Sequence, residues 1–438
     1  MSLDSNVDLR LDARWVIPVA SVGALPEHSV LIDGGRIVAV LPTAIAATRY
    51  VAREHRKLNT HALIPGLVNA HGHAAMTLMR GLADDLPLDR WLQEYIWPRE
   101  NAHVSPEFVG DGSLLAAGEM VRGGITCCND MYFFPEATAT SLRRVGMRAM
   151  IGLAVLEFPT PYAADAADYL GKGLAMRDTF RQDPLLSFAL APHAPYTVSD
   201  ASLGQIVTYA EQLDLPIQIH LHETASEIAD SRKQYGKRPL ARLDDLGAVG
   251  PGFQAIHAVH LEFEEIALLR ERGAGVVHCP SSNLKLASGI APVAAMLQAK
   301  LNLALGTDGA ASNNRLDLFE EMRLAALLAK GASGSAATLP AQQALECATL
   351  GGARVLGLDK VIGSIEAGKA ADLVAVDLAA IESQPCFDPV SHLVYVCGRR
   401  DVTDVWVAGK AVLNHRQLLH VATDELSARA QYWQERLQ

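Results

Sequence analysis

The residues of this sequence that could carry out chemistry are histidines and carboxylates that follow short apolar runs. His71 and His73 stand one residue apart at the end of such a run. Because side chains at positions i and i+2 of a strand point to the same side, both imidazoles can approach one ion. The pair alone is a weak signal, since hydrogen-bonded core or loop histidines are the commoner explanation of this spacing.

Further residues of the same kinds follow later apolar runs: His193, His220, His222, Glu223, His257, His260 and Asp308. The placement of His220 and Asp308 at the ends of other runs turns the first pair into a predicted metal site. Three histidines and an aspartate offer nitrogen and oxygen ligands that suit zinc, while iron and manganese also fit.

The elements that must position these residues are eight apolar runs, separated by stretches with helical spacing at 114–122, 202–213, 263–272 and 293–298. The runs cover residues 62–73, 124–132, 146–156, 185–197, 215–223, 253–261, 273–280 and 301–309. Eight strands alternating with helices predict an α/β fold, a TIM-like (β/α)₈ barrel. In this architecture the active site lies at the carboxyl ends of the strands, where the histidines are found.

The two ends of the chain have a different pattern. Residues 28–42, 363–378 and 401–413 each resemble two short strands joined by a turn, and the first contains Asp33-Gly34-Gly35. We therefore predict a small composite β-sandwich domain formed by residues 1–61 and 363–438. The barrel would occupy residues 62–362.

Composition limits the functions that need to be considered. The formal net charge of −11 argues against nucleic-acid binding, and no run of 18 apolar residues predicts a membrane span. The N-terminal residues lack the layout of a signal peptide, and none of the six cysteines forms a CxxC pair. We expect free thiols in a cytoplasmic protein. The motifs of serine hydrolases, P-loop proteins and the CxxC-type zinc deaminases are missing.

Four stretches carry a specific resemblance that, with the chain ends, covers nearly the whole sequence. They are PGLVNAHGHAAMTLMRGLADDLPLDRWL (65–92), HLHETASE (220–227), CPSSNLKLASG (279–289) and GTDGAASNN (306–314). They resemble the amidohydrolase superfamily, and within it the 5′-methylthioadenosine/S-adenosylhomocysteine deaminases. The terminal segments IDGGRIVAV (32–40) and GSIEAGKAADLVAVD (363–377) are similar to the composite β-domain of that family.

The resemblance implies a role for each candidate residue. The implied metal ligands are His71, His73, His220 and Asp308. Glu223 is the implied acid/base carboxylate, Asp308 takes part in proton transfer, and His257 lies near the substrate. Glu100 and His193 match substrate-binding positions, and Glu223 and Asp308 also contact the substrate.

Some of these assignments have competitors. His220 and His222 share one face of a strand, so geometry cannot choose between them, and only the H-x-x-E spacing of the family selects His220. On the next apolar run His257 is preferred over His260, but the choice stays open. His278 is expected to be structural.

The resemblance also bears on the metal. Two-metal members of the superfamily bridge their metals with a carboxylated lysine at the fourth strand, and residues 185–197 contain no lysine. We therefore expect one divalent metal per subunit, zinc first, with iron as the alternative.

The implied activity is hydrolytic deamination of an adenosine-like nucleoside. Residues 74–100 could form an apolar cover suited to a 5′-methylthio group, although an ordinary barrel segment fits the same pattern. Residues 152–173 contain no arginine to pair with a homocysteine carboxylate. We therefore expect 5′-methylthioadenosine and adenosine to be preferred over S-adenosylhomocysteine.

The same sequence features leave two alternative functions open. The runner-up is a triazine or other heterocycle chlorohydrolase or aminohydrolase of the same superfamily. A non-catalytic, metal-stabilised binding protein is a remote alternative. By resemblance to the family we expect a homo-oligomer, either a dimer or a tetramer.

Overall fold

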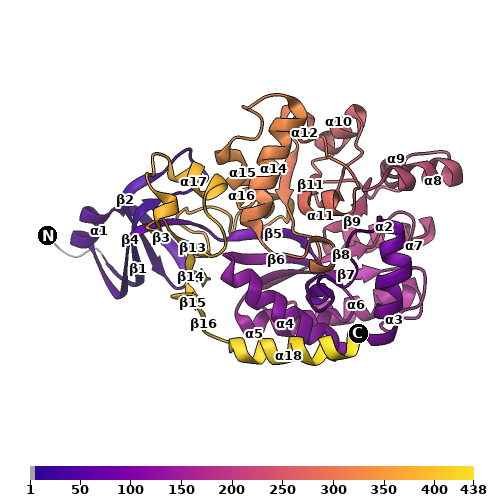
Figure 1. Ribbon diagram of the computed structural model, residues 1–438, viewed down its shortest axis with the longest axis horizontal. Coiled ribbons are helices and arrows are strands. Elements are labelled where there is room, and N and C mark those ends of the chain that lie inside the picture. Colours follow the sequence, from indigo (N-terminus) through magenta and orange to yellow (C-terminus); the bar gives the residue numbers. More distant parts are fainter. Residues whose placement is uncertain (1–4) are drawn as a thin grey trace.

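The computed structural model describes residues 5–438 and contains two eight-stranded sheets (Figure 1). One sheet is parallel throughout and takes its strands in chain order, one from each predicted apolar run. They are β5 (Leu67–Gly72), β6 (Ile125–Tyr132), β7 (Arg148–Val155), β8 (Leu186–Pro192), β9 (Ile217–Leu221), β10 (Phe253–His257), β11 (Gly275–His278) and β12 (Asn302–Leu305). The amide of Asp308 donates to the carbonyl of His71 at 3.1 Å, bringing the last strand end beside the first. The (β/α)₈ barrel is confirmed.

Helices cover the outside of this barrel (Figure 1). The four predicted helical stretches lie in them, except that Arg272 follows the end of its helix. The helices are α4 (Pro106–Arg122), α5 (Pro135–Val145), α6 (Ala166–Phe180), α7 (Asp200–Leu213), α8 (Ala225–Tyr235), α9 (Pro239–Asp245), α10 (Phe263–Glu271), α11 (Pro280–Lys285), α12 (Val293–Gln298), α13 (Ala310–Asn313), α14 (Leu318–Ser333), α15 (Ala341–Cys347) and α16 (Leu350–Val355). Because the helices cover it, the strands are buried along almost their whole length, as the apolar runs predict.

The second sheet is built from both ends of the chain, in the order β16-β15-β14-β13-β4-β1-β2-β3. Its strands are β1 (Ser5–Val16), β2 (Leu25–Asp33), β3 (Arg36–Pro42), β4 (Tyr50–Pro65), β13 (Leu373–Asp377), β14 (Val402–Val407), β15 (Lys410–Asn414) and β16 (Gln417–Leu418). A short helix, α1 (Thr43–Arg49), connects β3 to β4. The antiparallel pairing of β4 with β13 joins the two ends of the chain into one mixed sheet.

Two of the three predicted hairpins are present, as β2–β3 and β14–β15. The hairpin predicted at residues 363–378 is wrong, because only β13 forms there. Residues preceding β13 pair with the edge strand β3 instead: the amide of Ile37 donates to the carbonyl of Lys369, and the amide of Gly368 donates to that of Ile37. The predicted limit between the small domain and the barrel, at residues 61 and 62, falls inside the continuous strand β4. The domain limits stay predictions.

The remaining elements pack against the barrel. They are the 3₁₀ helix η1 (Ala74–Met79), α2 (Leu88–Arg90), the π-helix η2 (Trp91–Ile96), α3 (Trp97–His103), the 3₁₀ helix η3 (Ile381–Ser383), α17 (Pro389–Tyr395) and α18 (Thr423–Leu437). α18 lies along α4 (Figure 1). The ring of Trp433 on α18 meets that of Phe108 on α4 at a centroid distance of 5.1 Å. Among the described residues, no helix has the length and apolar character needed to cross a membrane.

Candidate metal centre and active site

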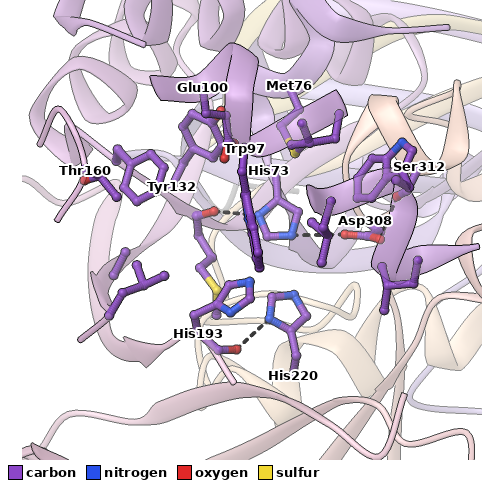
Figure 2. A pocket seen from close by; sticks show the side chains of 18 of the residues that line it. His73, Met76, Trp97, Glu100, Tyr132, Thr160, His193, His220, Asp308 and Ser312 are labelled. Carbon is purple, nitrogen blue, oxygen red and sulfur yellow. Dashed lines mark hydrogen bonds and ion pairs between the residues drawn. The ribbon is translucent and has the colours of Figure 1, made fainter. Parts of the chain in front are cut away.

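Four side chains converge at the carboxyl ends of the barrel strands. His71, His73, His220 and Asp308 offer ligand atoms that all lie within 4.8 Å of one another. Nε2 of His220 lies 3.2 Å from Nε2 of His71, and Oδ1 of Asp308 lies 3.1 Å from Nε2 of His73 and 3.5 Å from that of His71. Figure 2 shows His73 and His220 facing the same space as Asp308. The structure thus brings together the four predicted metal ligands.

The spacing of these atoms fits one small cation. Ligand atoms around a tetrahedral metal at about 2.0–2.1 Å are separated by about 3.3 Å, close to the three distances measured here. Two imidazole nitrogens 3.2 Å apart could form a direct hydrogen bond only if one of them carried the proton. The cluster is therefore either a metal site or a direct hydrogen bond between two rings, and the hydrogen bonds made by Nδ1 of His73 and of His220 decide between them.

Backbone carbonyls orient two of the three imidazoles (Figure 2). His73 donates from Nδ1 to the carbonyl of Met131 at 2.6 Å, and His220 donates from Nδ1 to the carbonyl of His193 at 2.7 Å. A neutral ring that donates from Nδ1 presents an unprotonated Nε2, which is the form that binds a metal. These hydrogen bonds aim lone pairs at the centre of the cluster and favour the metal interpretation.

Asp308 is held in place by its own partners. Ser282 and Ser312 donate from their hydroxyls to Oδ2 at 2.6 and 2.7 Å, which leaves Oδ1 for the cluster. The backbone of Asp308 has a φ of +59°, a conformation that costs free energy and is typical of functional sites. A glycine precedes it by two residues because a Cβ at Gly306 would lie 3.0 Å from backbone atoms of His71.

The electrostatics of the cluster suit cation binding. Burial lowers the pKa of His71 to about 4 and lowers that of His220 well below its usual range, so both rings are neutral at pH 7. Burial opposes protonation of His73 as well, but hydrogen bonding and charge from Asp308 outweigh it and raise the pKa of His73 to about 9. His73 and Asp308 therefore hold a proton between them in the metal-free protein, and a divalent cation would take the place of this proton.

Glu223 and His257 lie beside the four ligands. Oε2 of Glu223 is 3.8 Å from Nε2 of His257, whose Nδ1 is 2.8 Å from the side-chain oxygen of Asn283. Burial raises the pKa of the Glu223 carboxyl, so that it retains a proton to higher pH than an exposed glutamate. The Glu227 carboxylate accepts the amide hydrogen of Glu223 at 2.9 Å and fixes the backbone at this position.

The competing histidines take other positions. His222 is buried with Nδ1 3.4 Å from a carboxylate oxygen of Glu265, on the side away from the cluster. The ring of His260 binds the carbonyl of Ser288 at 2.8 Å, and His278 is buried in the barrel. None of the three lines the cavity described next, whereas His220 and His257 do.

A cavity of about 300 Å³ opens above the cluster. Seven of the eight predicted site residues line it, while His71 lies fully buried behind them: His73, Glu100, His193, His220, Glu223, His257 and Asp308. The segment from η1 to α3 supplies a largely apolar wall, formed by Met76, Leu88, Trp91, Leu92, Ile96 and Trp97. The predicted cover at residues 74–100 therefore faces the site, and part of it also packs on the barrel.

Several lining residues were not anticipated from the sequence. The Tyr132 hydroxyl donates to Glu100 at 2.7 Å (Figure 2), and burial raises the pKa of Glu100 to about 7. Phe158, Thr160 and Tyr196 belong to the loops after β7 and β8 and also line the cavity. Tyr132 is the last residue of β6, so the rule that strand ends face the site could have found it.

Comparison with known proteins gives consistent matches. The sequence profile of the amidohydrolase family matches residues 62–412. A 5-methylthioadenosine/S-adenosylhomocysteine deaminase of Teredinibacter turnerae is 47% identical over 100% of this chain and 99% of the relative.

Solved structures give the same result for the fold. The structure of an adenosine deaminase from Xanthomonas campestris with bound zinc is similar over 99% of both chains, with a TM-score of 0.98 and 51% identity. An atrazine chlorohydrolase from Arthrobacter aurescens, complexed with zinc, has a TM-score of 0.91 over 97% of this chain and 99% of its own. Its identity is 22%, so this likeness extends to the fold alone.

Proposed function

The chain belongs to the amidohydrolase family, and on that premise we propose that it is a metal-dependent deaminase of adenosine-like nucleosides. Its preferred substrate would be 5′-methylthioadenosine, converted to 5′-methylthioinosine and ammonia. The observation that carries the proposal is that Glu223 and Asp308 line one cavity beside a cluster of three imidazoles that can bind a metal. The full-length relatives named 5-methylthioadenosine/S-adenosylhomocysteine deaminase support the same reaction.

We assign one divalent cation to His71, His73, His220 and Asp308. Zinc suits this ligand set, and the zinc in a structure with 51% identity supports that choice, although iron would accept the same ligands. When bound, such a cation supplies Lewis-acid activation of a water molecule near neutral pH. Residues 185–197, which contain β8, the fourth strand of the barrel, include no lysine that could bridge a second metal.

Proton transfers by this chain's own residues complete the reaction. Glu223 donates a proton to N1 of the adenine ring, which makes C6 electrophilic. Asp308 accepts a proton from the attacking water as its oxygen forms a bond to C6. When the C6–N bond breaks, Asp308 returns this proton to the leaving amine, which departs as ammonia. As the C6 carbonyl forms, the hydroxyl on C6 releases the second proton of the water, and this proton restores Glu223, while the proton on N1 stays on the product. His257 would steady the attacking oxygen from beside Glu223.

The cavity lining supports the proposed order of substrates. Glu100 can accept hydrogen bonds from ribose hydroxyls, and His193 can contact the ring or the sugar. The apolar wall that includes Trp97 suits a methylthio group. No lysine or arginine is found among the described residues that line the cavity, so the carboxylate of S-adenosylhomocysteine would lack a cationic partner.

An ultraviolet assay on the zinc-loaded protein tests reaction and substrate together, because loss of the 6-amino group changes the absorbance of adenine. The panel contains 5′-methylthioadenosine, adenosine, S-adenosylhomocysteine, guanine, cytosine and an aminotriazine. We expect the highest kcat/KM for 5′-methylthioadenosine. Comparable values for S-adenosylhomocysteine would contradict the proposed preference, and turnover of the triazine alone would contradict the deaminase assignment. The cytoplasmic location and the homo-oligomeric state stay predictions.

A further inference from the structure

Five arginines converge on a second cleft, which shares no lining residue with the active-site cavity. They are Arg80, Arg122, Arg399, Arg400 and Arg416. The cleft has a volume of about 760 Å³ and lies between α4, the loop before β14, the turn between β15 and β16, and the start of α18. Figure 1 shows α18 beginning next to β16, below the barrel. A concave space of this size is in the range of small-molecule sites.

Two of the five arginines have carboxylate partners. Glu119 accepts hydrogen bonds from Arg80 and, at 2.7 Å, from Arg399. Arg399 also lies 3.8 Å from Asp317, which is buried outside the cleft. Glu119 is the single carboxylate among the described residues that line the cleft, so its charge is shared between two guanidinium groups.

The other three arginines have no ion-pair partner among the described residues. Nη1 of Arg416 donates instead to the backbone carbonyls of Arg399, Arg400 and Val402, at 2.9, 2.9 and 2.6 Å. These bonds hold the loop so that Arg399 and Arg400 face the cleft. Burial, and then the positive charge of Arg122, lower the pKa of Arg416.

We propose that this arginine cleft binds a small molecule that carries several phosphate groups, with Arg122 and Arg400 as its main contacts. One guanidinium group can donate two parallel hydrogen bonds to the oxygens of a phosphate. The side chains of Arg122 and Arg400 have no ion-pair partner among the described residues and can bind in this way. The overall net charge of −11 makes an extended polyanion a poor partner, whereas a compact anion meets only the local positive charge. Thr423, which also lines the cleft, offers a hydroxyl as a neutral donor.

Calorimetric titration of the full-length protein with inorganic tripolyphosphate at low ionic strength tests the site. We expect one tripolyphosphate per chain and about tenfold weaker binding to the Arg122→Gln/Arg400→Gln variant. Deamination should be unchanged in this variant, because neither arginine lines the active-site cavity. Should the double variant fail to fold, the exposed Arg400→Gln alone serves the same purpose.

The matched control is Arg181→Gln/Arg323→Gln, which removes two exposed arginines elsewhere and changes the net charge equally. Tripolyphosphate binding should stay within about twofold of the wild type in the control. Equal weakening in both double variants, or no binding to the wild type, would overturn the proposal. So would tighter binding of a hexaglutamate peptide or of a short single-stranded RNA, because either would indicate a macromolecular partner.

Discussion

At the scale of the residue, the protonation state of Glu223 links the geometry to the proposed reaction. Its carboxyl must carry a proton when the nucleoside binds, and burial raises its pKa in that direction. The Glu223→Gln variant keeps the shape but loses the acidic proton. We expect kcat to fall by about 10²- to 10⁴-fold, the usual contribution of a general acid.

Initial rates with 5′-methylthioadenosine and metal analysis of the same samples check this prediction. Metal content should match the wild type, since the four proposed ligands are untouched. The exposed Glu211→Gln, an identical chemical change far from the cavity, serves as the control. Full turnover of Glu223→Gln with metal bound would remove Glu223 from the mechanism.

At the scale of the element, Glu265 ties helix α10 to the end of β9. It accepts hydrogen bonds from Arg238 at 2.7 Å and lies 3.4 Å from the ring of His222, directly before Glu223. Burial opposes ionisation, but His222 and Arg238 outweigh it and lower the pKa of Glu265 to about 2. A carboxyl whose pKa is lower in the folded protein contributes stability above its unfolded pKa and loses it as pH falls.

We therefore expect Glu265→Gln to lower the free energy of unfolding by about 2–4 kcal/mol at pH 7. Denaturant unfolding of both proteins at several pH values measures the difference. The difference should shrink as pH falls from about 4.5 toward about 2, where the wild-type carboxyl becomes protonated. The neighbouring exposed Glu264→Gln should have little effect at any pH. A pH-independent difference would mean that packing, not charge, explains the loss.

At the scale of the whole molecule, a buried ion pair joins the barrel to the small sheet. Arg148 at the start of β7 donates from Nε to Asp372, just before β13, at 2.9 Å, and Asp372 also accepts the amide hydrogen of Ala408. Both side chains are almost fully buried. Arg148→Met would leave the Asp372 carboxylate without its cation in a low-dielectric interface.

We expect this change to cost about 3–5 kcal/mol and to lower the melting temperature. The double variant Arg148→Met/Asp372→Asn removes the stranded charge and should recover part of the loss. Thermal melting of the wild type, of Arg148→Met, of Asp372→Asn and of the double variant measures this coupling. If the double variant were the sum of its parts, the two residues would not be coupled and the pair would not hold the two sheets together.

Much of this architecture could be predicted because its signals are local in the sequence. Strands buried on both faces must be apolar, so each barrel strand is visible as a run, and the strand ends then indicate the site. The hairpin prediction for the segment before β13 is wrong because the partner of that segment, the edge of β3, lies more than 300 residues earlier in the chain. The arginine cleft was not visible for the same reason, since its five guanidinium groups come from three separate parts of the sequence.

By itself, the sequence determined the eight strands, the kinds of ligand at their ends and the family resemblance. Only the tertiary structure decided which histidine of each pair faces the cavity. The rule that residues i and i+2 share a face holds only inside a strand, and β9 ends at Leu221. The backbone then enters the left-handed region, with φ of +53° at His222, which turns that side chain toward Glu265 while His220 stays in the cluster.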